Sequence, residues 1–275
     1  GVNYAGWGYL TKKPRTDQEW DWGVACMREV AEYAKETGDK ANSFRYENGQ
    51  SIAKAVPFST LSPNAWKKID GKYYSGDGSV IEGAVAKGID VSHHQGTVDW
   101  KKAKEDGVEF AIIRCGFGMN QTKQDDAQWF NNVKGCEENN IPYGVYLYSY
   151  ADTVKKAQSE AEHVLRLIKG HTLAYPVYYD IEEKAVLNKL TAEQLGKIAA
   201  TFVNKVKAEG YQTGIYSNKS NFETFLTDSQ FSQWNKWVAQ YNSAACTYKG
   251  TYQIWQAADT GTIDGVNGAV DINFA

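Results

Sequence analysis

The sequence predicts an α/β barrel preceded by a smaller N-terminal α+β subdomain. From residue 87 onward, short apolar segments alternate with amphipathic ones, which is typical of strands alternating with helices. Eight strand-like segments are separated by only five helix-like ones, and the last three strands follow one another without helices. This pattern favours a closed (β/α)5(β)3 barrel with helices outside. We therefore expect an N-terminal subdomain at residues 1–86 and a barrel domain at residues 87–275.

The N-terminal subdomain is expected to hold one helix and one hairpin. A stripe of apolar residues predicts a helix that begins after Thr16 or Asp17 and ends at Gly38. The Asp70-Gly71 pair, flanked by short apolar stretches, predicts a β-hairpin. Residues 65–84 faintly resemble one unit of the aromatic cell-wall-binding repeats of bacterial surface proteins. Such units need neighbours to bury their faces, so a small structural subdomain is the alternative interpretation.

The barrel elements can be assigned from periodicity and helix-capping residues. The helix that follows Thr191 is marked by a capping box with Gln194 and by Gly210 at its end. Strands are expected at residues 87–92, 109–117, 143–150, 176–183, 213–218, 236–242, 251–257 and 269–274, and helices at residues 98–107, 126–139, 153–169, 191–210 and 219–226. An open doubly wound sheet is the alternative fold, but no glycine-rich nucleotide loop follows the first strand.

Four acidic side chains are predicted to converge at one end of this barrel. Asp180 and Glu182 alternate with apolar residues in the stretch PVYYDIEE, so they share one face of a strand. Asp90 and Asp271 lie near the ends of the first and last strands, which are neighbours in a closed barrel. Active sites of such barrels lie where the strands end. Repulsion between neighbouring carboxylates raises the pKa of at least one of them, which suits acid/base chemistry on a bond that needs both a proton and a stabilised cation. The alternative interpretation of each acid taken alone is that it caps a loop.

Composition and charge exclude several other classes of protein. The net charge is −3 with no long basic run, so no nucleic-acid partner is expected. No apolar run reaches the roughly 18 residues that span a membrane. The four cysteines form no CxxC pair, which leaves a disulfide or buried thiols open. His93 and His94 are adjacent, but no third ligand is indicated, so we expect no metal and no cofactor, and a hydrogen-bonding role for these histidines.

Six motifs in the barrel region occur in the order and spacing of a known family. They are KGIDVSHHQGTVDW at residues 87–100, YYDIE within residues 176–183, GIYSN at 214–218, KWVAQY at 236–241, YQIWQ at 252–256 and VDINF at 270–274. Together they resemble the glycoside hydrolase family 25 lysozymes, the muramidases of bacteria, phages and some fungi. The resemblance covers residues 87–275 and leaves residues 1–86 without a match. The third strand departs from it, because Tyr146, Leu147 and Tyr148 stand where many members carry Tyr-His-Phe.

The resemblance implies a flattened barrel and a lysozyme activity. Family members cleave the β-1,4 bond between N-acetylmuramic acid and N-acetylglucosamine in peptidoglycan. It implies that Glu182 is the general acid, that Asp180 orients or stabilises the 2-acetamido group, and that Asp90 and Asp271 complete the acidic site. Tyr148, Tyr216, Tyr241 and Trp255 are candidates for stacking on sugars and Gln256 for binding an acetamido group, with packing under the rim as the alternative role.

The expected partner is bacterial cell-wall peptidoglycan, bound by a monomer. The chain opens on Gly1 without a signal-like apolar core, so we expect a mature or trimmed product that is secreted, wall-associated or phage-encoded. Two other functions stay open at this point. One is a wall-binding module that has lost activity, and the other is a related β-glycosidase that acts on chitin-type chains.

Overall fold

The computed structural model describes residues 43–45, 51–53, 67–75, 78–241 and 243–275. The helix expected within residues 16–38 lies outside these residues. The chain divides into two compact units, residues 1–58 and residues 59–275. In the first unit, the described strands β1 (Ser43–Arg45) and β2 (Ser51–Ala53) pair antiparallel.

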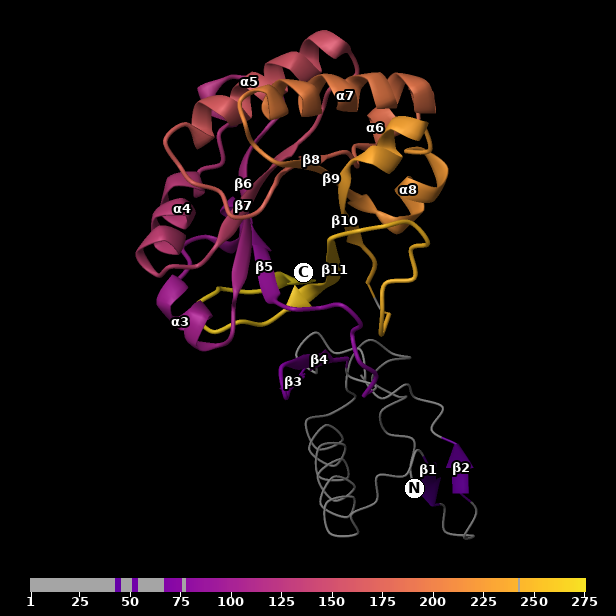
Figure 1. Cartoon of the computed structure of the whole chain (residues 1–275). Helices are drawn as coiled ribbons and strands as arrows, with labels where there is room; N and C mark the ends of the chain where they lie inside the picture. Colours follow the sequence, from indigo (N-terminus) through magenta and orange to yellow (C-terminus); the bar gives the residue numbers. More distant parts are fainter. Residues whose placement is uncertain (1–42, 46–50, 54–66, 76–77, 242) are drawn as a thin grey trace, which may run out of the picture. The chain divides into compact units, whose positions relative to one another are not determined.

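Eight strands of the second unit form a closed barrel, as the sequence predicts (Figure 1). The order around the barrel is β10-β11-β12-β5-β6-β7-β8-β9. The strands are β5 (Lys87–Val91), β6 (Phe110–Phe117), β7 (Tyr143–Tyr148), β8 (Val177–Asp180), β9 (Thr213–Asn218), β10 (Asn235–Ala239), β11 (Ile254–Gly261) and β12 (Val270–Phe274). Each expected strand is therefore present, and β8 is the one that the structure shortens most, because Ile181 and the residues after it leave the sheet.

The helices connect the strands β5 to β10 and lie outside the barrel (Figure 1). They are α3 (Trp100–Glu105), α4 (Trp129–Glu138), α5 (Val154–Ile168), α6 (Lys184–Leu187), α7 (Ala192–Ala208) and α8 (Lys219–Thr224), with short 3-10 turns η1 (His93–Gln95), η2 (Thr122–Gln124) and η3 (Ser229–Gln233). The capping box expected at the start of α7 is present, since the Thr191 side chain accepts from the Gln194 amide and the Gln194 side chain accepts in return. The short helix α6 was not predicted.

The last strand runs in the opposite direction to the one that we expected. β12 pairs antiparallel with both β11 and β5, so the barrel is mixed and not wholly parallel. Asp271 is the second residue of β12 and lies opposite Asp90 in the register. It therefore reaches the end of the barrel where β5 to β8 finish, although it stands at the start of its own strand. We call this end the barrel mouth.

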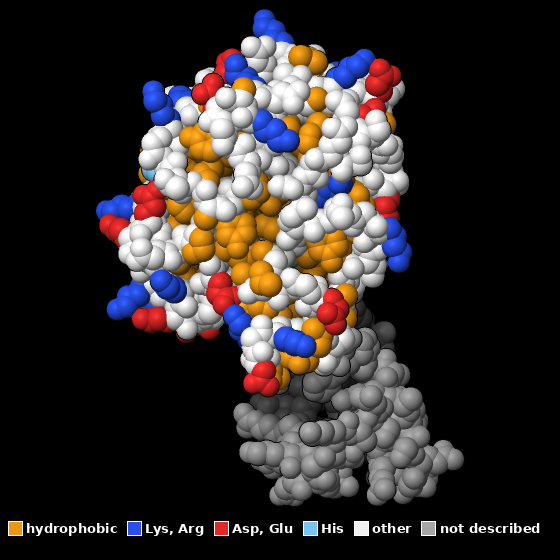
Figure 2. Space-filling model, viewed as in Figure 1, with side chains coloured by type: hydrophobic (Ala, Val, Ile, Leu, Met, Phe, Trp, Pro, Cys, Tyr) orange, Lys and Arg blue, Asp and Glu red, His pale blue; other side chains and the backbone are white. Residues whose placement is uncertain are grey.

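Side chains separate into an interior layer and a layer under the helices. The interior cluster contains Trp237, which packs against Tyr216 and Tyr178 with ring centroids 4.3 and 5.4 Å apart. Tyr179, the neighbour of Tyr178, points outward and stacks on Phe202 of α7 at 3.9 Å. On the face shown in Figure 2, hydrophobic side chains gather in the middle and charged ones lie mostly around the edge. Because side chains alternate along a strand, Asp180 lies on the same side of β8 as Tyr178 and points to the barrel interior, as the sequence predicts.

The hairpin before the barrel belongs to the barrel unit and not to a separate subdomain. β3 (Lys67–Ile69) and β4 (Lys72–Tyr74) pair around Asp70 and Gly71, whose φ angles of 49° and 79° are those of the predicted Asp-Gly turn. The Tyr73 ring meets Phe274 of β12 at 5.3 Å. Residues 59–86 are accordingly grouped with the barrel in one compact unit, and a domain boundary at residue 86 stays a prediction.

The other general expectations concern cysteines and membranes. Cys115, Cys136 and Cys246 are free thiols, so among the described cysteines the reduced alternative holds. Across the described segments, no helix combines the length and the apolar character needed to cross a bilayer.

Candidate active site

A cavity at the barrel mouth collects the four acids that the sequence singled out. Asp90 comes from β5, Asp180 ends β8, Glu182 lies two residues after it, and Asp271 is the second residue of β12. The described residues that line it are Asp90, Ser92, His94, Gln95, Arg114, Tyr146, Tyr148, Asp180, Glu182, Tyr216, Trp237, Tyr241, Gln256, Asp259 and Asp271. Five carboxyl groups thus face one cationic guanidinium, and this excess of acid sets the electrostatics of the site.

Asp180 and Glu182 occupy the end of the strand on which the prediction centred. Asp180 is buried, and among the described residues no donor reaches its Oδ1 atom. Burial, and then the charges of Glu182 and Asp90, raise the pKa of Asp180 well above its ordinary range. Burial, followed by the charges of Asp90 and Glu183, also raises the pKa of Glu182. Both groups therefore hold a proton to higher pH than an exposed carboxyl group does.

Asp90 and Asp271 form a hydrogen-bonded pair of acids across the β5–β12 register. Burial raises the pKa of Asp90, while hydrogen bonds from Asn273, Gln256 and Asp271 oppose that rise. Burial and the neighbouring charge of Asp90 raise the pKa of Asp271 to about 9. Two carboxyl groups this close share one proton near neutral pH, because two negative charges at this distance would repel each other.

Two of the expected sugar-binding tyrosines are joined through Gln256. The Tyr216 and Tyr241 hydroxyls donate to Gln256 Oε1 at 2.7 and 2.6 Å. Gln256 Nε2 donates in turn to Asp90 Oδ2 at 2.7 Å. All three side chains line the cavity, so a bound molecule would meet them directly.

Tyr148 reaches the cavity, but Trp255 does not. The Tyr148 hydroxyl donates to Glu183 Oε2 at 3.3 Å, and its ring lies beside the cavity. Trp255 is 1 % exposed, points to the opposite face of β11 from Gln256, and donates from its indole to the Gln240 carbonyl. Because adjacent strand residues face opposite ways, the expected sugar contact of Trp255 is corrected to a packing role.

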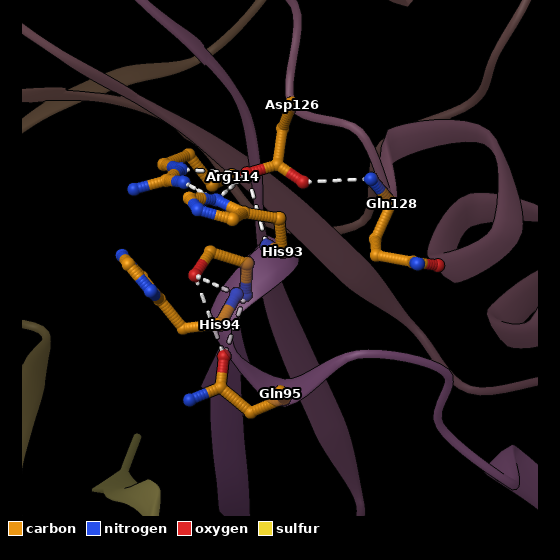
Figure 3. A network of polar contacts seen from close by, with 7 residues as sticks. His93, His94, Gln95, Arg114, Asp126 and Gln128 are labelled. Carbon is orange, nitrogen blue, oxygen red and sulfur yellow. Dashed lines mark hydrogen bonds and ion pairs between the residues drawn. The ribbon is translucent and has the colours of Figure 1, made fainter.

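A second polar network borders the cavity on the side of β5 and β6 (Figure 3). The buried carboxylate of Asp126 accepts from Arg114 Nε at 2.7 Å and from the His93 amide at 3.0 Å through Oδ2, and from the Gln128 amide at 2.9 Å through Oδ1. The His93 ring contacts both Arg114 and Asp126. His94 stacks on His93, with ring centroids 4.0 Å apart, and lines the cavity. His93 therefore has the hydrogen-bonding role that we expected, whereas the side chain of His94 contacts the His93 ring.

Sequence reasoning missed several lining residues that carried a readable signal. Arg114 is a charged residue in the middle of the apolar strand AIIRCGF, which marks a functional or paired position. Tyr146 shares a face with Tyr148 by alternation, so both should have been named together. Asp259 lies in the part of β11 that the prediction left out. Asn273, which lies behind the lining and donates to Asp90, could have been found by the same argument as Tyr146, because it shares a face of β12 with Asp271.

The barrel and its acid-lined mouth define an α/β-barrel glycosidase. A model of the family described as "Glycosyl hydrolases family 25" matches residues 89–266. The chain therefore belongs to glycoside hydrolase family 25, as the motifs indicated. The family match stops short of the N-terminal unit, residues 1–58.

Relatives and solved structures agree with this assignment. The chain is 31% identical over 193 residues to the uncharacterized protein YegX of Escherichia coli O157:H7, covering 68% of each protein. It is 27% identical over 187 residues to an autolytic lysozyme of Clostridium acetobutylicum, covering 68% of this chain and 55% of that protein. The modular autolysin LytC of Streptococcus pneumoniae, solved with a synthetic peptidoglycan ligand, superimposes with a TM-score of 0.69 at 27% identity over 85% of this chain. This chain spans 60% of the length of that autolysin.

A bacterial lysozyme from Streptomyces coelicolor gives a TM-score of 0.61 at 26% identity. The alignment covers 68% of this chain and 90% of that lysozyme. The shared part is therefore nearly the whole of the smaller enzyme, which corresponds to the barrel here.

Proposed function

We propose that this chain is a peptidoglycan hydrolase that cleaves the β-1,4 bond between N-acetylmuramic acid and N-acetylglucosamine. The observation that carries the proposal is the convergence of Asp90, Asp180, Glu182 and Asp271 on one cavity. Membership of the family and the likeness to lysozymes and to an autolysin support the choice of substrate. The proposal includes action on bacterial walls from outside the cytoplasm, by a single copy of the chain.

Glu182 is the proton donor in this proposal. A general acid must be protonated when the substrate is bound, and burial together with the charge of Asp90 raises the pKa of Glu182 toward neutral pH. Its position two residues after the end of β8 places it at the cavity, and among the described side chains no lysine or arginine forms an ion pair with it, although Arg114 lines the same cavity. Transfer of its proton to the glycosidic oxygen allows the leaving sugar to depart as an alcohol.

Asp180 holds and stabilises the sugar that becomes cationic. Its Oδ1 atom is a buried acceptor that the described residues leave without a donor. The N–H of a 2-acetamido group supplies such a donor and favours the ionised form of Asp180. The negative charge then stabilises the oxocarbenium-like or oxazolinium-like cation that forms when the bond breaks.

The remaining lining residues are suited to hold the glycan chain. Tyr148, Tyr216 and Tyr241 present rings and hydroxyls at the cavity, and Gln256 presents an amide. Aromatic rings pack against the apolar faces of sugars, while hydroxyl and amide groups bond to sugar hydroxyls and acetamido groups. These contacts position the bond to be cut beside Glu182.

Replacement of Glu182 by Gln tests the role of the acid. We expect clearing of a peptidoglycan suspension to fall by about 10²–10⁴-fold, with an unchanged circular dichroism spectrum. Glu193→Gln, on the exposed face of α7, is the matched control and should clear at the wild-type rate. Full activity of Glu182→Gln would contradict the assignment of the acid.

The bond itself is tested by mass spectrometry of the muropeptides that the wild-type chain releases. The proposal expects a reducing N-acetylmuramic acid end, and a reducing N-acetylglucosamine end would refute it. Cleavage of chitin oligomers at a rate equal to that of peptidoglycan would point to the broader chitin-type activity. Binding to purified wall without any released product would point to a wall-binding module.

A further inference from the structure

A chain of hydrogen bonds behind Asp90 begins at an indole, which fixes the direction of every bond in it. Trp237 Nε1 donates to Asn273 Oδ1 at 2.8 Å, and Asn273 Nδ2 donates to Asp90 Oδ2 at 2.8 Å. Trp237 is 1 % exposed and Asn273 is fully buried. An indole nitrogen can donate but cannot accept, so the Asn273 oxygen must face Trp237. The Asn273 amide nitrogen must then face Asp90.

A second N–H group reaches the same oxygen of Asp90. Gln256 Nε2 donates to Asp90 Oδ2 at 2.7 Å, while its own oxygen accepts from Tyr216 and Tyr241. Two donors on one carboxylate oxygen leave no place for a proton there, since a protonated oxygen would direct its own hydrogen at an N–H. Asp90 is therefore held as a carboxylate on its Oδ2 side.

Among the described residues, no comparable pair of donors reaches Asp271. It shares a hydrogen bond with Asp90 across the register of β5 and β12. Since the pair holds one proton near neutral pH and Asp90 is the member stabilised as an anion, the proton resides on Asp271. Burial and the charge of Asp90 raise the pKa of Asp271 to about 9, in agreement with this placement.

We propose that Trp237 and Asn273 are positioning residues that keep Asp90 ionised and the shared proton on Asp271. Asp271 then enters the reaction as a neutral hydrogen-bond donor, and the charge of Asp90 keeps Glu182 protonated as the acid. The inference rests on the proposed function for its catalytic consequence, but the choice of Asp271 over Asp90 for the proton follows from the direction of the hydrogen bonds.

Other charged and titratable groups face the same cavity and influence the protonation of Asp90 and Glu182. Arg114 is the one guanidinium in the lining, and it opposes the rise in the pKa of Asp180. The groups that surround Asp90 and Glu182 are His94 from η1, Arg114 from β6, Tyr146 and Tyr148 from β7, Asp180 from β8, Glu183 from the loop after it, Tyr216 from β9, Tyr241 from the loop after β10, Asp259 from β11 and Asp271 from β12. The substitutions below leave all of these in place.

The first test is the dependence of kcat/KM on pH in Asn273→Leu and in Trp237→Phe. Either change removes a donor from the chain, so Asp90 takes up a proton more readily and its charge near Glu182 falls. Glu182 then loses its proton at lower pH, and the alkaline limb of the profile should move down by about half a unit to one unit. Trp237→Phe retains an aromatic ring against Tyr216, which limits disturbance of the packing.

Tyr143→Phe is the control for the loss of one partly buried hydrogen bond that lies away from the site. The Tyr143 hydroxyl donates to Glu137 Oε1 at 2.7 Å on the outside of the barrel, away from the acids. It should lower the melting temperature in the way that the test variants do, but leave the alkaline limb where it is. If Asn273→Leu and Trp237→Phe behave like Tyr143→Phe, their role is structural and the inference fails.

The second test locates the proton without any substrate. In protein labelled with ¹³C at the aspartate carboxyl carbons, the NMR shift of each carboxyl reports its own protonation as the pH is raised. At pH 7 the signal of Asp271 should be that of an acid and the signal of Asp90 that of a carboxylate. The opposite assignment overturns the inference, even if the chain cleaves peptidoglycan. If the proton is found on Asp271 but the chain does not cleave peptidoglycan, the proposed function is refuted and the location of the proton still holds.

Discussion

Asp271→Asn should make the protein more stable, and the gain should grow with pH. The folded protein holds the Asp271 proton up to about pH 9, whereas in the unfolded chain this carboxyl has its ordinary pKa of 3.8. Between these values the folded state binds a proton that the unfolded state has lost. Stability therefore falls as the pH rises from about 4 to about 9, and a side chain without this proton escapes that fall.

The size of the effect follows from the distance between the two pKa values. At pH 7 the gap above 3.8 is 3.2 units, which corresponds to about 4 kcal/mol at about 1.4 kcal/mol per unit. Asp271 is only partly buried, so screening by water makes the energy smaller than this value. The amide of the introduced asparagine can still donate to Asp90. We expect a gain of about 2–4 kcal/mol in the free energy of unfolding at pH 7 and almost none at pH 4.

Urea unfolding at whole pH units from 4 to 8, followed by tryptophan fluorescence and circular dichroism, measures this gain. Asp264→Asn, at an exposed position before β12, is the matched control for the exchange of an acid for its amide. A gain that is the same at every pH, or a loss of stability at pH 8, would refute the reasoning. Activity should fall in the same variant, because Asp271 lines the cavity.

Two further substitutions test the packing that holds the site. Gly135→Ala in α4 would place a Cβ atom 2.0 Å from Trp100 Cδ1. This clash outweighs the roughly 1 kcal/mol by which alanine favours a helix over glycine. Thermal unfolding should therefore show a lower melting temperature, and a higher one would contradict the close contact between Gly135 and Trp100. Glu160→Gln puts an NH₂ group or a weaker acceptor against the hydroxyls of Ser149 and Tyr179, which donate to the buried carboxylate. It should cost about 1–3 kcal/mol in urea unfolding, more than Tyr179→Phe, and an equal loss in the two variants would show that the charge of Glu160 contributes nothing.

The elements of the barrel could be predicted because their signals are local. The capping box at Thr191 fixed the start of α7, and the Asp70-Gly71 pair fixed the turn of the hairpin. Alternation along PVYYDIEE directed Asp180 inward correctly. What these signals do not contain is the partner of each strand, so the attachment of the hairpin to β12 could not be found from the sequence.

The error at Trp255 came from ignoring the same rule that succeeded on β8. Trp255 and Gln256 are adjacent in one strand, so they cannot both face the cavity. Gln256 is the polar member of the two, so it is the one that can form hydrogen bonds with the acids and tyrosines of the interior. The network that it forms with Asp90 and Asn273 joins residues 166 and 183 positions apart, which no local pattern reveals.

The direction of β12 was also readable, and it decides whether the site exists. Only eight residues, 262–269, connect β11 to β12, whereas a crossover between parallel strands needs about a dozen or more. The short connection forces β12 to return antiparallel. In a parallel β12, Asp271 would lie near the start of the strand at the far end of the barrel, about 10 Å or more from Asp90 at the strand rise per residue. The antiparallel return brings Asp271 opposite Asp90, so the fourth acid of the site depends on the length of one loop.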